Sequence, residues 1–283
     1  MKIGIGLPNT IPATPGDLLI RWALRAEEAG FSSLATIDRI VYPSYESLLA
    51  LAAAGAVTDR IGLMTNVLLG PTRNPVLLAK EAASLDQVSG GRLTLGLGVG
   101  SREDDYEAAG QDFHTRGKRW DQDLELIHRA WRGEPMGGGK PVGPRPVRGD
   151  RVPVMIGGTN DRAIERVVRW GVGWTMGGGA AEQGGPFAER VRKAWKDGGR
   201  EGQPRIVGLS YFVLGEGADE EGAAYLSDYY GPYGPRIAQA MPRSAEQLRE
   251  AASRFEGYGF DELFFDPTVA DLAQLDLAAE AVL

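Results

Sequence analysis

The amino-acid sequence predicts an α/β protein in which eight parallel strands and the helices between them close into a (β/α)8 TIM barrel. Short apolar runs alternate with longer amphipathic segments, as in successive βα units. Most units repeat after about 30 residues, and the length of 283 residues suits eight of them. The alternative is a doubly wound open sheet, which usually has fewer strands and one leading glycine-rich turn.

Each predicted strand is a short apolar run. In chain order the strands are 2–7, 34–37, 61–67, 93–98, 152–157, 173–176, 205–214 and 262–265. The helices predicted around them are 18–29, 45–57, 75–88, 118–132, 161–170, 186–198, 218–228, 244–257 and 271–282. Thr14 before Pro15, Asn74 before a proline, and Ser244 with Gln247 are predicted as helix caps, because their side chains can accept from free backbone N–H groups.

Composition places the chain among soluble globular proteins. Hydrophobic residues make up 43% and charged residues 24%, and the 40 glycines follow no collagen-like period. The absence of Cys excludes disulfides, thiolate metal sites and cysteine nucleophiles. A net charge of −7 argues against a nucleic-acid partner. The longest apolar stretch, 48–57, is too short to cross a membrane. We therefore expect a cytoplasmic protein with one domain over 1–283 and no membrane partner.

Two connections between predicted strands are unusually long, and both are predicted at the catalytic face of the barrel. The first, residues 134–150, is rich in Gly, Pro and Arg. The second adds the helix at 218–228 and then Tyr229 to Pro235, an aromatic segment that we interpret as a lid. Surface decoration is the alternative interpretation of both.

The strand ends, where a barrel carries its chemistry, hold few acids or bases. We expect His128 on a helix surface and His114 at a solvated helix start. The acidic run Glu103 to Asp105 is interpreted as a solvated helix start, since three consecutive side chains diverge rather than share one ion. No metal site is predicted, so a bound organic cofactor is expected to supply the reactive atoms.

Glycine-rich turns after two strands predict a phosphate-binding site. Gly157 to Asn160 directly precede the helix that starts at Asp161, whose N–H groups face an anion in this arrangement. Gly177 to Gly179 follow the next strand and are expected to form a second wall. The predicted cofactor-binding residues at these strand ends are Gly98, Gly100, Gly157, Gly158, Thr159, Gly177, Gly178 and Gly179.

The segments Arg60 to Leu69 and Ser89 to Gly100 resemble the luciferase-like monooxygenase superfamily of flavin- and deazaflavin-dependent oxidoreductases. The likeness covers most of the chain. It implies a barrel that binds FMN or the deazaflavin coenzyme F420 with the ring over the strand ends. It also implies a cis peptide bond beneath the ring, and the matching cofactor-binding residues here are Asn66 and Val67.

The sequence departs from the sugar-phosphate dehydrogenase branch of that family. Arg39 stands where that branch has His, after the shared Asp38, and Ser101 stands where it has Glu, so we do not expect that activity. Asp38 and Arg39 are predicted as an ion pair that either faces the cofactor or a substrate anion in a catalytic role, or ties the second strand to its loop. The predicted substrate contacts are Asn9, Ser101, Arg102, Tyr106 and Tyr230.

The resemblance implies an oxidoreductase that uses reduced FMN, with oxygen, on a small organic substrate. Coenzyme F420 is the alternative cofactor for a hydride transfer, with the basic loop Lys140 to Arg151 holding its glutamate tail. A cofactor-free lyase or isomerase acting on a phosphorylated substrate, which needs a Lys or an acid/base pair, and a non-catalytic flavin-binding relative remain open. Expected protein partners are a separate flavin reductase and a second copy, which contacts Leu48 to Val57 in a homodimer.

Overall fold

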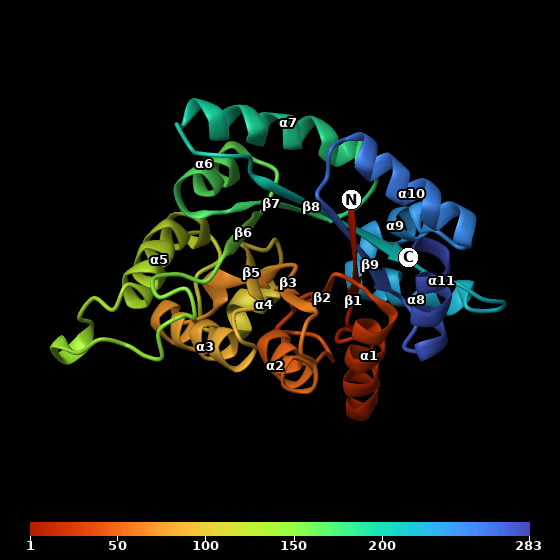
Figure 1. Ribbon diagram of the computed structural model, residues 1–283, viewed down its shortest axis with the longest axis horizontal. Coiled ribbons are helices and arrows are strands. Elements are labelled where there is room, and N and C mark those ends of the chain that lie inside the picture. The colour runs from red at the N-terminus through yellow and green to blue at the C-terminus, as the bar shows by residue number, and fades with distance from the viewer.

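The computed structural model describes residues 1–283 and confirms the closed parallel barrel (Figure 1). Its strands are β1 (Lys2–Gly6), β2 (Ser33–Thr36), β3 (Gly62–Thr65), β4 (Leu68–Leu69), β5 (Leu93–Gly98), β6 (Val154–Gly157), β7 (Gly173–Gly178), β8 (Arg205–Phe212) and β9 (Glu262–Pro267). They lie in the order β3-β2-β1-β9-β8-β7-β6-β5-β4, and pairing of β3 with β5 closes the ring. The open-sheet alternative is therefore excluded.

Helices surround the strands on the outside (Figure 1). They are α1 (Gly16–Ala29), α2 (Ser47–Val57), α3 (Pro75–Val88), α4 (Glu103–Ala108), α5 (Arg116–Trp131), α6 (Asp161–Trp170), α7 (Ala181–Asp197), α8 (Asp219–Tyr230), α9 (Gly234–Ala240), α10 (Ala245–Gly257) and α11 (Leu272–Val282). Short 3-10 turns are η1 (Gly70–Thr72), η2 (Gly137–Gly139) and η3 (Gly231–Tyr233). No helix is both long enough and apolar enough to span a membrane.

The predicted third strand is divided into two pieces. β3 ends at Thr65, the peptide bond between Asn66 and Val67 is cis, and the chain resumes as the two-residue strand β4 beside β5. β3 and β4 together therefore form one of the eight walls of the barrel. The interruption lies at the carboxyl end, where the sequence places the cofactor.

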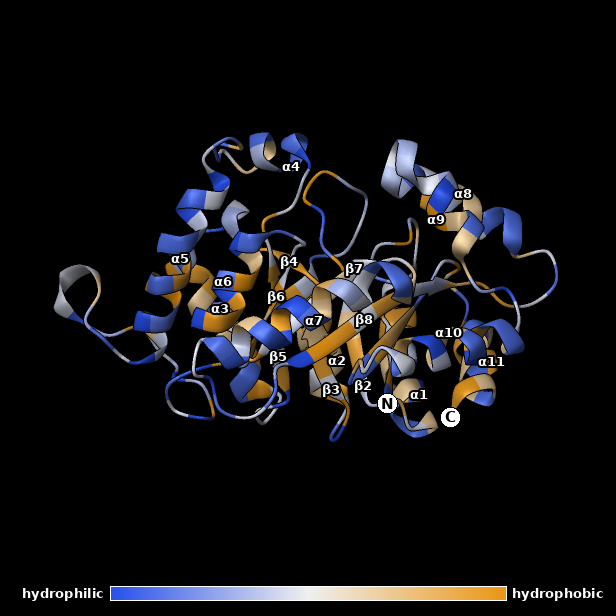
Figure 2. Ribbon diagram, turned by 90° about the horizontal axis from the view of Figure 1, so that it is seen from above, coloured by the Kyte–Doolittle hydropathy of each residue, from blue (hydrophilic) through white to orange (hydrophobic).

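Two apolar regions hold the barrel together. Inside it, Ala35, Met64, Met155, Val207 and Phe264 from five strands form one buried cluster. Between the sheet and the helices lies a much larger cluster that contains the fully buried indoles of Trp22, Trp120, Trp131 and Trp174. In Figure 2 the strands are largely orange, whereas the helices alternate between orange and blue segments. Burial on both faces explains why the strands appear in the sequence as continuous apolar runs.

Of the three predicted helix caps and the predicted start of α7, two caps agree with the structure. Asn74 accepts from two backbone N–H groups at the start of α3, and Ser244 accepts from the Gln247 N–H. Gln247 itself accepts from the Arg243 N–H, so the predicted reciprocal capping box is only half present. The other two starts differ from the prediction.

Thr14 does not cap α1. Its hydroxyl donates to the Ile11 carbonyl, and the residue at the N-cap position is Pro15, directly before the first helical residue, Gly16. The predicted start of α7 at Pro186 is also wrong. The helix begins at Ala181 and runs through the proline, whose missing N–H removes one bond from the ladder.

His128 is buried within the molecule, and its predicted position on a helix surface is wrong. Its side chain lies against Trp170, with ring centroids 4.9 Å apart, and its exposed fraction is 8%. Burial lowers the pKa of His128 to about 4. His114, by contrast, is solvated as predicted.

The segment 134–150, the outer insertion, lies outside the ring, and its predicted position at the catalytic face is wrong. It follows α5 and precedes β6, so it leaves a helix rather than a strand end. Near the C-terminal end of α3, Gln87 donates to the Arg145 carbonyl (2.7 Å), and the Val147 N–H donates to Asp86 (2.8 Å). In Figure 1 the segment projects beyond α3 and α5, away from the strands.

The segment 213–240, the pocket insertion, follows β8 and includes α8, η3 and α9. It lies on the same side of the barrel as α4, opposite the two termini (Figure 2). The predicted position at the catalytic face is therefore confirmed for this segment. Helix α2, predicted as the dimer contact, buries Leu48 and Leu51 in the core and exposes Leu49 and Val57.

Candidate functional site

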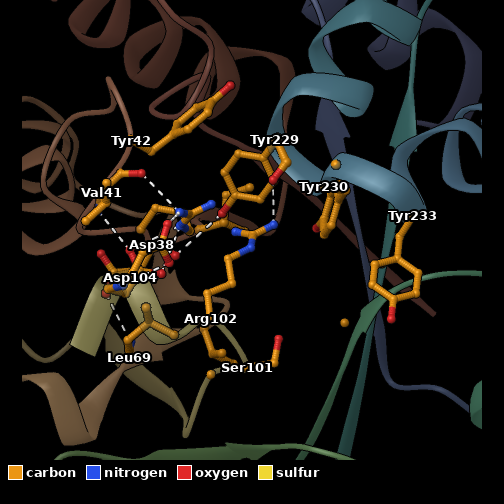
Figure 3. Close-up of a pocket in the computed structure, with 18 of the residues that line it drawn as sticks. Asp38, Val41, Tyr42, Leu69, Ser101, Arg102, Asp104, Tyr229, Tyr230 and Tyr233 are labelled. Carbon is orange, nitrogen blue, oxygen red and sulfur yellow. Dashed lines mark hydrogen bonds and ion pairs between the residues drawn. The ribbon is translucent and has the colours of Figure 1, made fainter. Parts of the chain in front are cut away.

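A cavity of about 920 Å³ opens over the carboxyl ends of the strands, between α4 and the pocket insertion (Figure 3). The predicted site residues that line it are Asp38, Arg39, Asn66, Val67, Gly100, Ser101, Arg102, Gly177, Gly178 and Tyr230. Tyr42, Leu209 and Tyr233 line it too. The structure thus brings together residues that are far apart in the sequence.

The floor of the pocket is built around Val67. A side-chain carbon at Gly98 would lie 2.7 Å from one methyl group of Val67, and one at Gly157 would lie 3.1 Å from the other. These two predicted cofactor glycines therefore make room for Val67. Beside it, the Asn66 side-chain oxygen accepts from Thr175 (2.6 Å), and the Asn66 amide nitrogen is buried without a partner.

Asp38 does not pair with Arg39, so the predicted ion pair is wrong. The buried Asp38 carboxylate accepts from the Arg73 guanidinium (3.0 Å) and from the Leu69 N–H (3.0 Å). Arg73 also pairs with Glu46 at the start of α2. Asp38 thus fixes the chain just after the cis bond. This role resembles the predicted alternative in which the pair ties the second strand to a loop, although the partner is Arg73 rather than Arg39.

Arg39 pairs with the acidic start of α4 instead. Its guanidinium lies 2.8 Å from Asp105 and 2.8 Å from Asp104. Asp105 also accepts from the N–H groups of Ile40 and Val41 and is fully buried, so the prediction of a solvated acidic run fails at this residue. These bonds fix the loop after β2 against α4 before any ligand arrives.

Arg102 is the cation of the pocket that has no carboxylate within 4 Å. It donates to the Tyr229 carbonyl (2.5 Å), and its guanidinium lies 4.8 Å from the centre of the Tyr229 ring and 5.5 Å from that of Tyr230. Figure 3 shows it reaching from α4 toward the tyrosines. A partly exposed guanidinium without a counter-ion suits an anionic or π-rich ligand.

Tyrosines form the opposite wall. Tyr42 donates to Asp228 (2.6 Å), and the hydroxyls of Tyr211 and Tyr230 share a hydrogen bond of 2.6 Å. Burial raises the pKa of Tyr230 to about 12 and also raises the pKa of Tyr229 well above its usual value, so these hydroxyls stay protonated. Tyr233 is 73% exposed at the rim.

The glycine turns occupy their predicted places after β6 and β7. The register between β7 and β8 shifts between Thr175 and Gly178, and this irregularity leaves Gly177 exposed in the pocket. Gly158 has φ +107°, and the Trp174 indole donates to its carbonyl (2.7 Å), which fixes the turn. The capping side chain at the start of α6 is Asn160, which accepts from the Ala163 N–H.

Several predicted site residues do not line the pocket. Asn9 is fully buried and bonds to backbone groups of Ile37, and Tyr106 is buried with its hydroxyl donating to the Val99 carbonyl. Also away from the lining are Gly98, Gly157, Gly158, Thr159 and Gly179. Gly158 and Thr159 are exposed at the start of α6. No residue of the outer insertion lines the pocket, so its predicted role in holding a cofactor tail has no support there.

Sequence reasoning missed three residues that organise the site: Tyr42 and Asp105, which line the cavity, and Arg73, which does not. Arg73, Asp105 and Tyr42 follow no strand pattern that marks them as functional. The sequence feature that could have indicated this pairing is charge. Asp38 is an acid at the end of one strand and Arg73 is a base after the next strand, so each can neutralise the other.

Comparison with known proteins gives four findings. The family model described as luciferase-like monooxygenase matches residues 1–266. An uncharacterized protein of Mycobacterium tuberculosis is 31% identical over 227 residues, covering 68% of this chain and 77% of that protein. The F420-dependent glucose-6-phosphate dehydrogenase of Kribbella flavida is 29% identical over 144 residues, covering 47% and 43%. The monooxygenase RslO1 from Streptomyces bottropensis has the same fold, with a TM-score of 0.80, 22% identity and coverage of 99% and 98%.

Proposed function

The chain belongs to the luciferase-like monooxygenase family, and we propose that it is an oxidoreductase that uses reduced FMN on a small organic substrate held against the tyrosine wall. Family membership supports redox chemistry with a flavin-type cofactor. The cavity of about 920 Å³ is large enough for a flavin ring and a small substrate.

One observation carries the proposal: the pocket offers unused donors, whereas its buried carboxylates are already engaged. Asp38 and Asp105 are held by arginines, and neither Lys nor His lines the cavity. Asn66 presents an unpartnered amide nitrogen, and Arg102 has no counter-ion. A lyase or isomerase needs an acid/base pair or a lysine in the pocket, whereas a flavin brings its own reactive atoms.

The residues present fit such a cofactor and have distinct roles. Val67 would support a planar cofactor ring from the pocket floor, and the unpartnered Asn66 amide would be available to donate a hydrogen bond to it. Arg102 attracts the negative charge of the cofactor or substrate, and Tyr229 and Tyr230 exclude water from the opposite side. A bound reduced flavin supplies two electrons to oxygen or to an organic acceptor.

Coenzyme F420 is a second candidate cofactor, favoured by the partial likeness to the F420-dependent dehydrogenase of Kribbella flavida. The sugar-phosphate activity named for that enzyme is not proposed here. Arg39 and Ser101 stand at positions where that branch of the family has an acid/base pair, and Arg39 is fixed by Asp104 and Asp105.

Separate titrations with FMN and F420, followed by fluorescence and by thermal shift, test the proposal. We expect saturable binding of FMN that Arg102→Ala weakens. The matched control is Arg145→Ala in the outer insertion, which removes a similar bond between a guanidinium and a carbonyl without touching the pocket. Binding of F420 alone selects the second candidate, and binding of neither overturns the redox assignment.

A further inference from the structure

A buried acid lies at the carboxyl end of β9 and is not explained by the pocket contacts described above. Asp266 is 5% exposed, and its Oδ1 atom has no hydrogen-bond partner. It forms no ion pair with any Arg or Lys. Buried carboxylates are normally paired, because an unpaired charge in an apolar interior is very costly.

The surrounding strands leave space for this acid. On β1, the neighbouring strand, Gly6 has no side chain, and any carbon added there would collide with the Asp266 carboxyl. On β8, the other neighbour, Tyr211 stands in register with Asp266, so the two side chains project from the same face of the sheet. The acid therefore lies at the end of the barrel where the pocket opens.

Only tyrosines face Asp266 as titratable groups. They are Tyr211 on β8 and Tyr225 and Tyr230 on α8, and proximity to the acid contributes to the raised pKa of each of them. With no cation nearby, burial raises the pKa of Asp266 to about 8. At neutral pH the group is therefore an uncharged carboxylic acid with a proton to donate.

Two linked hydroxyls connect the strand neighbour of this acid, Tyr211, with the pocket. Tyr211 bonds to Tyr230 through their hydroxyl oxygens at 2.6 Å, and Tyr230 lines the pocket, whereas Tyr211 does not. Both hydroxyls stay protonated, so each can accept one proton and release another.

We propose that Asp266 is a proton donor for the site, acting through a bridging water and the hydroxyls of Tyr211 and Tyr230. In the step, the Asp266 O–H bond breaks, each intervening oxygen takes up one proton and passes on another, and Tyr230 delivers a proton to a basic atom of the ligand. Asp266 is left as a carboxylate, which regains a proton from solvent through the pocket. The reaction served rests on the proposed function, whereas the protonation state of Asp266 does not.

The first test needs no cofactor. The pKa of Asp266 is about 8 in the folded protein and 3.8 in the unfolded chain. Between these two pH values the folded protein holds a proton that the unfolded chain has lost, so the free energy of unfolding decreases as pH rises. We expect the unfolding equilibrium constant of the wild type, relative to Asp266→Asn, to rise about tenfold per pH unit between pH 4 and 8. Infrared spectra should show a protonated carboxyl at pH 7 that Asp266→Asn removes. A flat ratio or a carboxylate band overturns the proposal.

The second test uses the protein loaded with whichever cofactor binds. Asp266→Asn and Tyr230→Phe should each lower kcat about 100-fold and abolish its fall above pH 8. Tyr225→Phe is the control. Tyr225 lies near Asp266 and on the same helix, α8, as Tyr230, but it bonds to Thr10 and does not line the pocket. An unchanged kcat in Asp266→Asn assigns a structural role only and overturns the proposal. If neither FMN nor F420 binds, the proposed function fails, and the first test still decides whether Asp266 holds the proton.

Discussion

The two long insertions of this barrel differ in the element that each one follows. The outer insertion (134–150) follows helix α5, and the pocket insertion (213–240) follows strand β8. The outer insertion contacts α3 through the Arg145 carbonyl and the Val147 N–H, whereas the pocket insertion contributes Tyr229, Tyr230 and Tyr233 to the cavity.

This difference teaches that composition does not decide what an insertion does in a barrel. Both segments are rich in Gly and Pro, and the outer one carries more positive charge. Only a segment that leaves the carboxyl end of a strand starts at the functional face. We therefore expect changes near the outer insertion to affect stability and changes in the pocket to affect binding.

Among the predictions that compare the two insertions, the largest effect is expected at His128, whose pKa is influenced by Asp150 at the end of the outer insertion. Its pKa falls from 6.5 in the unfolded chain to about 4 in the folded protein, so its stabilisation is complete above pH 6.5 and is lost as pH falls toward 4. The loss amounts to about 3 kcal/mol, and the difference in unfolding free energy between the wild type and His128→Phe, followed at several pH values, measures it. His128→Phe keeps a ring against Trp170 and should lack this acid sensitivity, whereas cofactor affinity should not change. An equal acid sensitivity in the variant would contradict the assignment.

In the pocket, Arg102→Ala should weaken binding of an anionic ligand by about 2 kcal/mol, or roughly 30-fold, because a charge-assisted contact is lost. Isothermal titration at two salt concentrations measures both the loss and its electrostatic part. Arg145→Ala, the control in the outer insertion, should bind normally. Equal losses in both variants would remove the distinction between the two segments.

Tyr42→Phe should loosen the pocket insertion by about 1 kcal/mol, since the bond from Tyr42 to Asp228 on α8 is lost. Hydrogen exchange of the α8 amides should then become about fivefold faster. Tyr45→Phe also removes a hydroxyl bond, to the Thr14 carbonyl before α1, and should leave α8 unaffected. Unchanged exchange in Tyr42→Phe would show that α8 is held by its apolar contacts alone.

The smallest effect is expected for Lys140→Glu in the outer insertion. Affinity for either FMN or F420 should stay within about twofold, because no residue of this segment lines the pocket. A clear loss of F420 affinity, with FMN unaffected, would mean that the segment contacts the cofactor tail after all.

The positions of the strands could be predicted well, because strands that are buried on both faces appear in the sequence as continuous apolar runs. β5 matches its predicted range, whereas the third wall, predicted over 61–67, is divided at the cis bond into 62–65 and 68–69. The caps at Asn74 and Ser244 were predictable because they depend on neighbours within three residues. The position of the outer insertion could also have been deduced, since it follows a predicted helix.

The pairing of charges could not be predicted in the same way. Arg73 lies 35 residues after Asp38, and Asp105 lies 66 residues after Arg39. Asp38 and Arg39 are adjacent and opposite in charge, which suggested a pair, yet each is bound to a residue from another element. Nothing in the local pattern shows which distant partner the fold will bring to a side chain.

Two glycines beside Val67 affect the shape of the pocket although neither of them can contact a ligand there. Gly98 and Gly157 do not line the cavity, yet a methyl group at either one would press on the side chain that forms its floor. Alanine at these positions should therefore alter selectivity while leaving the fold intact. The shape of the pocket therefore depends on residues that do not line it.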